Sequence, residues 1–183
     1  QKFPDNLKPV RNNRQSHFKS TLTLFDRAFS DRTRAFLKIQ DGCNGFCGYC
    51  QIPYARGTSV SVPKDLILEE VARLVSQGVP EVVITGIHVG DYGRDIYPKG
   101  SKDAKYAFVE MLRSIFSIKG LKRLRISSLE PSEVSDEMLK LLHDHKEIFC
   151  DHFHLPLQSG SDPVLRRMNR TYTGNGCRSL LLR

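Results

Sequence analysis

Along most of the chain, segments with the apolar residue pattern of β-strands are each followed by a segment whose apolar residues have the spacing of a helix. Strands are predicted at residues 35–39, 81–86, 121–128 and 153–157, and helices at 63–78, 106–117, 135–142 and 162–168. Strands that alternate with helices in this way form parallel sheets built from right-handed βαβ units. The predicted fold class is therefore α/β, as an open sheet or as part of a barrel, because four units are too few to close an eight-stranded barrel.

Composition excludes two broad classes. Hydrophobic residues make up 39% of the 183 residues, enough to bury a core, so the chain is not a disordered acidic tail. The most apolar stretches, such as 82–87, are far shorter than the roughly 18 residues of a membrane-spanning helix, and residues 1–10 do not resemble a secretory signal. We therefore expect a cytoplasmic protein with no membrane segment. The net charge of +8 gives weak support for an anionic partner such as nucleic acid.

Three of the five cysteines, Cys43, Cys47 and Cys50, share one loop with the spacing C-x3-C-x2-C, directly after the first predicted strand. Ligands of parallel α/β folds bind at the carboxyl ends of strands, so a site is expected there. Three thiolates would hold three irons of a 4Fe-4S cluster and leave the fourth iron open to a small chelating ligand. The alternatives are buried cysteines without metal, or a zinc site, which usually takes four ligands in two separated pairs.

Further motifs carry a family pattern in the same order along the chain. They lie at residues 36–43, 50–57, 85–93, 125–131 and 154–162. Together with the cysteine spacing, they resemble the radical S-adenosylmethionine (radical SAM) enzymes and, more specifically, the methylthiotransferase family. Residues 38–43 and 53–57 look most like the branch that acts on threonylcarbamoyladenosine in tRNA.

The resemblance implies a fold and a domain organisation. The expected fold is a partial (βα)6 TIM-like radical SAM barrel, truncated here to about four βα units. Residues 1–33 resemble the linker from a missing N-terminal domain, and residues 34–183 a radical SAM core that is incomplete at its C-terminus. The tail that begins at Gly174 departs from the helix usual in the family.

The resemblance also implies two cofactors in this core and one outside it. A 4Fe-4S cluster on Cys43, Cys47 and Cys50 would bind S-adenosylmethionine (SAM) through the open iron, and a second 4Fe-4S cluster, which carries the sulfur to be inserted, is expected in the missing N-terminal domain. By the same resemblance, Cys150 and Cys177 are structural or incidental. The residues implied in binding SAM are Tyr49 in the cysteine loop and, at strand ends, Thr85, Gly86, Ser128, Glu130, Gln158 and Ser159.

The implied reaction is the conversion of N6-threonylcarbamoyladenosine at tRNA position 37 to its 2-methylthio derivative. Alternatives are methylthiolation of isopentenyladenosine in tRNA or of a ribosomal protein aspartate, or a non-catalytic, zinc-binding, RNA-associated module. The expected partners are tRNA and a low-potential electron donor such as flavodoxin or ferredoxin, and a monomer is expected. Without the second cluster, this chain by itself should not insert sulfur.

Several basic and histidine residues have two interpretations. His88 and His154 are expected to be hydrogen-bonded structural residues rather than ligands. A set of basic residues either contacts the tRNA backbone or forms a solvated face. The set is Lys119, Lys122, Arg123, Arg125, Arg166, Arg167 and Arg170. Arg125 has the further option of an ion pair with a carboxylate such as Glu130.

Overall fold

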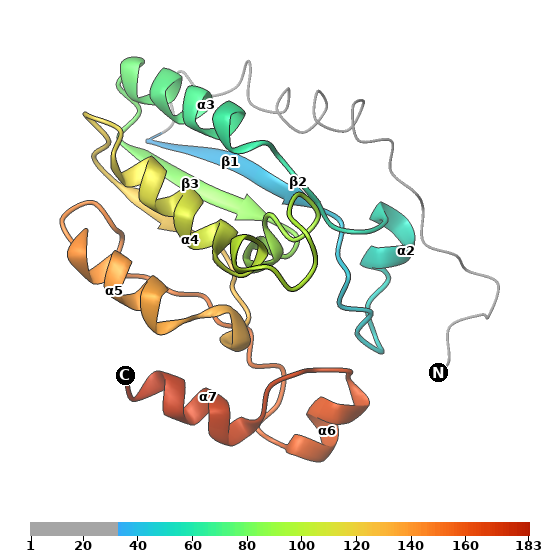
Figure 1. Ribbon diagram of the computed structural model, residues 1–183. Helices are drawn as coiled ribbons and strands as arrows, with labels where there is room; N and C mark the ends of the chain where they lie inside the picture. The colour runs from blue at the N-terminus through green and yellow to red at the C-terminus, as the bar shows by residue number, and fades with distance from the viewer. Residues whose placement is uncertain (1–32) are drawn as a thin grey trace.

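A four-stranded sheet forms the centre of the computed structural model, which describes residues 33–183 (Figure 1). The strands lie in the order β2-β1-β3-β4, with β1–β3 and β3–β4 parallel and β1–β2 antiparallel. Their bounds are Arg34–Asp41 for β1, Val60–Ser61 for β2, Glu81–Gly86 for β3 and Leu124–Ile126 for β4. The predicted α/β class is confirmed.

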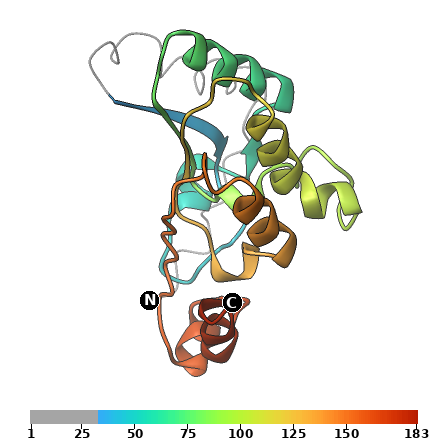
Figure 2. The same ribbon diagram turned by 90° about the vertical axis from the view of Figure 1, so that its left-hand side faces the viewer.

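Three long helices cover one side of this sheet. They are α3 (Lys64–Ser76), α4 (Lys102–Phe116) and α5 (Asp136–Asp144), which lie side by side in Figures 1 and 2. The shorter elements are α2 (Ile52–Arg56), α6 (Asp162–Arg167), α7 (Gly174–Leu181) and the 3-10 turns η1 (Val89–Asp91) and η2 (Pro131–Glu133). In Figure 1, α6 and α7 lie together below the sheet, and the residue after α7 that ends the chain, Arg183, forms an ion pair with Asp136 at the start of α5.

The core lies between the sheet and the long helices. Ala35, Leu37 and Ile39 alternate along β1 and are at most 2% exposed, as the period of a half-buried strand requires. Met111 of α4 and Met138 of α5 are fully buried against the same side. The alternation therefore directs the odd-numbered residues of β1 to the helices and leaves the even-numbered ones for the opposite face.

Side-chain caps fix where two of the long helices, α4 and α5, begin. Ser101 accepts a hydrogen bond from the Ala104 amide at 3.1 Å, which starts α4 earlier than the expected 106–117. Ser135 accepts one from the Met138 amide at 3.2 Å, and this confirms the expected cap of α5.

The predicted fourth strand at 153–157 is wrong. The described chain has three parallel strands rather than four, and only isolated bridges join Leu124 to Phe149 and Ser128 to His154. Pro156 has no amide hydrogen for a sheet ladder, and Leu157 is 36% exposed, so neither hydrogen bonding nor burial supports a strand here. The third predicted strand is also shorter than expected, at Leu124–Ile126.

The sequence of the tail from Gly174 was expected to depart from the helix usual in the family, but the structure has a helix there, α7. Thr173 accepts a hydrogen bond from the Gly176 amide at 3.1 Å and so caps α7, and Cys177 is buried within it. The predicted linker at 1–33 lies outside the described residues except for its last position. In the described part of the chain, none of the helices combines the length and apolar character needed to cross a bilayer.

Candidate functional site

The cysteine loop leaves the carboxyl end of β1 and is closed by backbone hydrogen bonds. The Cys43 amide donates to the Gly57 carbonyl at 3.1 Å, and the Cys50 amide donates to the Cys47 carbonyl at 2.9 Å. Gly42 has φ 71°, and a Cβ there would lie 2.2 Å from the Thr58 carbonyl oxygen, so only glycine fits. The three thiols are free and half-buried, which makes them accessible ligands.

The origin of the three thiols in one loop suits a cluster better than a structural zinc ion. Structural zinc usually takes four ligands as two separated pairs, whereas a cubane takes each thiolate on a different iron. A Cβ on Gly45 would lie 3.3 Å and 3.5 Å from the Cys43 and Cys47 sulfurs, so glycine keeps the space between them open.

A cavity of about 160 Å³ lies beside these thiols, at the carboxyl ends of the parallel strands. It is lined by Cys43, Cys47, Cys50, Ile52, Ile87, His88, Ser128, Leu129, Glu130, Pro156 and Arg170. The structure thus brings the three cysteines together with two other predicted site residues, Ser128 and Glu130. These five residues come from the loops after β1 and β4, and Ile87 and His88 of the same lining come from the loop after β3.

The other predicted contacts lie next to this lining rather than in it. Thr85 and Gly86 end β3, and the cavity is reached by the two residues that follow them. Gln158 and Ser159 follow the lining residue Pro156. Gln158 has φ 61°, a left-handed conformation that is uncommon for a residue with a side chain and is concentrated at functional sites.

Arg170 is a cavity residue that the sequence analysis placed elsewhere. Its side chain is 10% exposed, and it donates hydrogen bonds to Glu130 Oε1 and, at 2.6 Å, to the Tyr49 hydroxyl. Burial lowers the pKa of Arg170, but hydrogen bonds to Tyr49 and Cys47 outweigh this and raise it. Arg170 is therefore not part of a solvated face but a cation beside the thiols. Tyr49 does not line the cavity; it holds Arg170.

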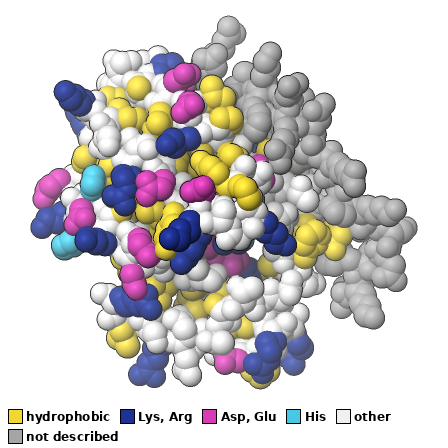
Figure 3. All heavy atoms as spheres, viewed as in Figure 1, with side chains coloured by type: hydrophobic (Ala, Val, Ile, Leu, Met, Phe, Trp, Pro, Cys, Tyr) yellow, Lys and Arg dark blue, Asp and Glu magenta, His cyan; other side chains and the backbone are white. Residues whose placement is uncertain are grey.

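Arg125 is likewise paired, with Glu81 rather than with Glu130, at 2.5 Å. Figure 3 shows Lys and Arg side chains interspersed with Asp and Glu on the face viewed, with no single basic patch there. On that face, charge alone does not mark a surface for nucleic acid.

The end of α6 packs on the cysteine loop. The Gly48 amide donates to the Met168 carbonyl at 3.2 Å, and the Asn169 side-chain amide donates to the Gly45 carbonyl at 2.9 Å. A Cβ on Gly48 would come within 3.1 Å of the Arg167 carbonyl oxygen, so the two segments are in close contact. Nothing in the sequence pattern indicated this contact.

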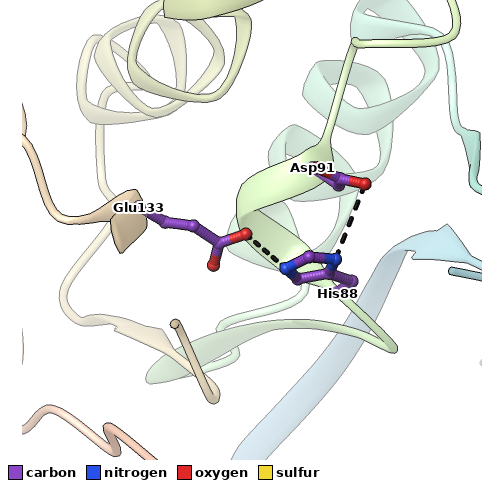
Figure 4. A group of neighbouring side chains, drawn as sticks. All are labelled: His88, Asp91 and Glu133. Carbon is purple, nitrogen blue, oxygen red and sulfur yellow. Dashed lines mark ion pairs between the residues drawn. The ribbon is translucent and has the colours of Figure 1, made fainter. Parts of the chain in front are cut away.

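His88 lies between two carboxylates from different turns (Figure 4). Its Nε2 is 2.6 Å from Glu133 Oε1, and its Nδ1 is 3.5 Å from Asp91 Oδ2 and 3.6 Å from Cys43 Sγ. Burial lowers the pKa of His88, but hydrogen bonds to Cys43 and Glu133 and the two negative charges raise it to about 10. At neutral pH, His88 is therefore an imidazolium. Neighbouring ligand atoms of one metal ion with bonds of about 2.1 Å lie roughly 3 Å apart. The 2.6 Å between His88 Nε2 and Glu133 Oε1 is shorter, which fits an ion pair rather than two ligands of one metal ion.

Both histidines that the sequence singled out have polar partners within the described chain. His154 Nδ1 lies 2.6 Å from the Ser128 hydroxyl and joins the loop after β4 to the segment before Pro156. Both histidines have the expected polar contacts, and that neither is a ligand stays a prediction.

Comparison with known proteins identifies the family. The model of the radical SAM superfamily matches residues 37–175, which include the cysteine loop and every lining residue of the cavity. The chain belongs to the radical SAM superfamily. The expected family is thereby confirmed, and with it the requirement of the superfamily for a 4Fe-4S cluster and SAM.

Two relatives place this radical SAM chain beside methylthiotransferases. It is 46% identical over 147 residues to the threonylcarbamoyladenosine tRNA methylthiotransferase MtaB of Bacillus subtilis, covering 80% of the chain and 31% of that protein. It is 39% identical over 140 residues to the tRNA-2-methylthio-N(6)-dimethylallyladenosine synthase of Lachnoclostridium phytofermentans, covering 76% of the chain and 29% of that protein. The chain thus spans about a third of the length of these relatives.

A solved structure confirms the fold. The radical SAM methyltransferase TsrM from Kitasatospora setae, with tryptophan substrate and a SAM analogue bound, superposes with a TM-score of 0.60 at 18% identity, over 81% of this chain and 28% of that one. The described sheet and helices are thus part of a TIM-like radical SAM fold, as predicted.

Proposed function

We propose that this chain is the radical SAM core of a tRNA methylthiotransferase that converts N6-threonylcarbamoyladenosine at position 37 to its 2-methylthio derivative. The observation that carries the proposal is the arrangement of three half-buried thiols from one loop around a cavity at the strand ends. The identity of 46% to the Bacillus subtilis enzyme supports the choice of substrate.

Cys43, Cys47 and Cys50 would hold the cluster, which, when bound, supplies the electron for reductive cleavage of SAM. Before this cleavage, the protein's own residues would bind and orient SAM. The Thr85–Gly86 turn would take its amino group through backbone carbonyls, and Gln158 and Ser159 its ribose and carboxylate. Thr85 and Gly86 stand next to the cavity at the end of β3, and Gln158 and Ser159 lie in the segment before α6.

Ser128 and Glu130 would form the opposite wall of the SAM site. Glu130 is paired with Arg170, so its negative charge is balanced within the wall of the site. Arg170 would also offset the negative charge of the thiolates, since it lies beside Cys47. Tyr49 fixes Arg170 through its hydroxyl.

The inserted sulfur, the electron donor and the tRNA would all come from outside residues 34–183. The sulfur would come from a second 4Fe-4S cluster in an N-terminal domain, joined through residues 1–33. Cys150 and Cys177, both buried and far from each other in sequence, are poor candidates for its ligands. We also propose a flavodoxin- or ferredoxin-type reductant, tRNA as partner, a monomeric state and a cytoplasmic location.

A second substrate is supported by one observation. The identity of 39% to the Lachnoclostridium phytofermentans synthase makes dimethylallyladenosine in tRNA the alternative. The two are separated by a chimera in which this chain replaces the matching segment of the Bacillus subtilis relative. Mass spectrometry of tRNA nucleosides from a strain that lacks the native enzyme should show 2-methylthio-threonylcarbamoyladenosine. A methylthio product on dimethylallyladenosine alone would reverse the assignment.

The cluster itself is tested on this chain after anaerobic reconstitution. About four irons and four sulfides per chain are expected for a single cubane. Cys43→Ala, Cys47→Ala and Cys50→Ala should each lose them, because two thiolates do not hold the cluster. Cys150→Ala is the matched control and should keep its iron. Stoichiometric zinc without iron would overturn the proposal in favour of a zinc-binding module.

A further inference from the structure

Gln40 is a fully buried amide with five polar neighbours. Its Nε2 lies within hydrogen-bond distance of the Asp41 carbonyl at 3.0 Å, the Gly42 carbonyl at 2.7 Å and the Ser59 hydroxyl at 2.8 Å. Its Oε1 accepts hydrogen bonds from two successive backbone amides, Ile87 at 3.0 Å and His88 at 2.8 Å. One side chain thus joins the start of the cysteine loop to the turn after β3.

The position of Gln40 explains why an amide is needed. β1 and β3 pair in regular register up to Lys38–Thr85, the register then shifts, and the last pair is Gln40–Gly86. Beyond this pair the strands separate, so their buried backbone N–H and C=O groups no longer form hydrogen bonds with each other. An amide side chain carries the same donor and acceptor as a peptide group, so Gln40 replaces the missing ladder bonds on both strands.

Gly86 makes this close approach possible. A Cβ at position 86 would lie 3.0 Å from both the backbone oxygen and Oε1 of Gln40, and 3.2 Å from its Cβ. These distances are shorter than ordinary van der Waals contact, so Gln40 would have to move by a few tenths of an ångström to admit a side chain at position 86. The two residues therefore form one packing unit at the strand ends.

We propose that Gln40 is a positioning residue for SAM, which fixes the turn after β3 relative to the cysteine loop. Gly42, which it holds on one side, directly precedes the ligand Cys43. Ile87 and His88, which it holds on the other side, line the cavity beside the three thiols. The amide thus sets the width of the cavity between the cluster ligands and the turn that would receive the methionine amino group. This inference rests on the proposed function of the site.

The test replaces the amide with the nearly isosteric carboxylate. Gln40→Glu retains an acceptor for the Ile87 and His88 amides but places an acceptor, not a donor, against the Asp41 and Gly42 carbonyls. After reconstitution, iron per chain should be unchanged, because no thiol is altered. The Kd for SAM, followed by the change that SAM causes in the EPR spectrum of the reduced cluster, should rise about tenfold or more.

Tyr92→Phe is the matched control. Tyr92 is also buried, and its hydroxyl donates a hydrogen bond to the Val62 carbonyl at 2.9 Å, but within the described residues it is neither a strand partner nor a hydrogen-bond partner of Gln40. Its Kd for SAM should stay near that of the wild type. An equal rise in both variants, or no rise in Gln40→Glu, would overturn the inference.

Two further measurements show whether a negative result contradicts the role of Gln40 alone or the proposed function as well. If Gln40→Glu does not fold, Ser59→Ala removes one neighbour of the same amide and should raise the Kd about twofold to threefold; an unchanged Kd overturns the inference. A wild-type chain that holds its cluster but binds no SAM would overturn the proposed function and the inference together. Wild-type binding with unaltered binding by the variants would overturn the inference alone.

Discussion

Replacing Glu133 by Gln should destabilise the chain in a pH-dependent way. Gln retains an oxygen that can accept the Glu130 amide, which Glu133 Oε2 binds at 2.8 Å, so the cap of η2 survives. What is lost is the charge 2.6 Å from His88 Nε2. The expected result is therefore a loss of the imidazolium ion pair without a loss of the local turn.

The size of the effect follows from the pKa of His88. A rise from 6.5 to about 10 corresponds to about 5 kcal/mol for all contacts of the imidazolium together, at about 1.4 kcal/mol for each pKa unit. Glu133 is the nearest of the carboxylates, and Asp91 remains in the variant, so Glu133→Gln should lower the free energy of unfolding by about 2–3 kcal/mol at pH 6.

The loss should become smaller as the pH rises. Because the pKa of His88 is higher in the folded chain than in the unfolded chain, its stabilisation is complete below pH 6.5 and is lost as the pH rises through about 10. At pH 9 the difference between wild type and Glu133→Gln should be about half of that at pH 6.

The assay is urea unfolding of the iron-free chain, followed by far-ultraviolet circular dichroism at both pH values. Glu69→Gln, which removes an exposed carboxylate on α3, is the control and should change stability by less than about 0.5 kcal/mol. A Glu133→Gln loss that is the same at pH 6 and pH 9, or no larger than that of Glu69→Gln, would refute the assignment of His88 as an imidazolium.

Three other substitutions have defined outcomes. Gly86→Ala should lower the free energy of unfolding by about 1–3 kcal/mol, because its Cβ would press on Gln40; an unchanged urea midpoint would contradict that contact. Arg170→Leu should lower it by about 2 kcal/mol, since the half-buried Glu130 carboxylate loses its partner, and Arg170→Lys should recover part of the loss in the same assay. Ser101→Ala should lower it by about 1 kcal/mol and raise hydrogen exchange in the first turn of α4.

The alternation of strands and helices was sufficient to predict the fold class, and the cysteine spacing to predict the candidate ligands. Both signals are local, because they depend on residue types a few positions apart. The segment 153–157 shows the limit of such signals: its apolar residues have the composition of a strand, but whether it joins the sheet depends on neighbours far away in sequence.

The site residues that sequence reasoning missed depend on distant contacts. Arg170 faces Glu130 and Tyr49 across 40 and 121 positions, and Gln40 faces His88 across 48. A polar residue near the end of an otherwise apolar strand was the available signal for Gln40. In the sequence, Arg170 is only one of several basic residues, and the fold is needed to show that its side chain is largely covered and paired with Glu130.

The packing of residues 168–170 on the cysteine loop has a consequence for the order of folding. The loop begins near the start of the described chain, but Asn169 reaches Gly45 across 124 positions. Contacts between such distant segments form late, because a long stretch of chain must be ordered before they are gained. During synthesis, the thiols therefore emerge well before the segment that packs against them. A ribosome-bound chain from which residues 168–170 have not yet emerged therefore presents its cysteines on a loop that lacks these contacts.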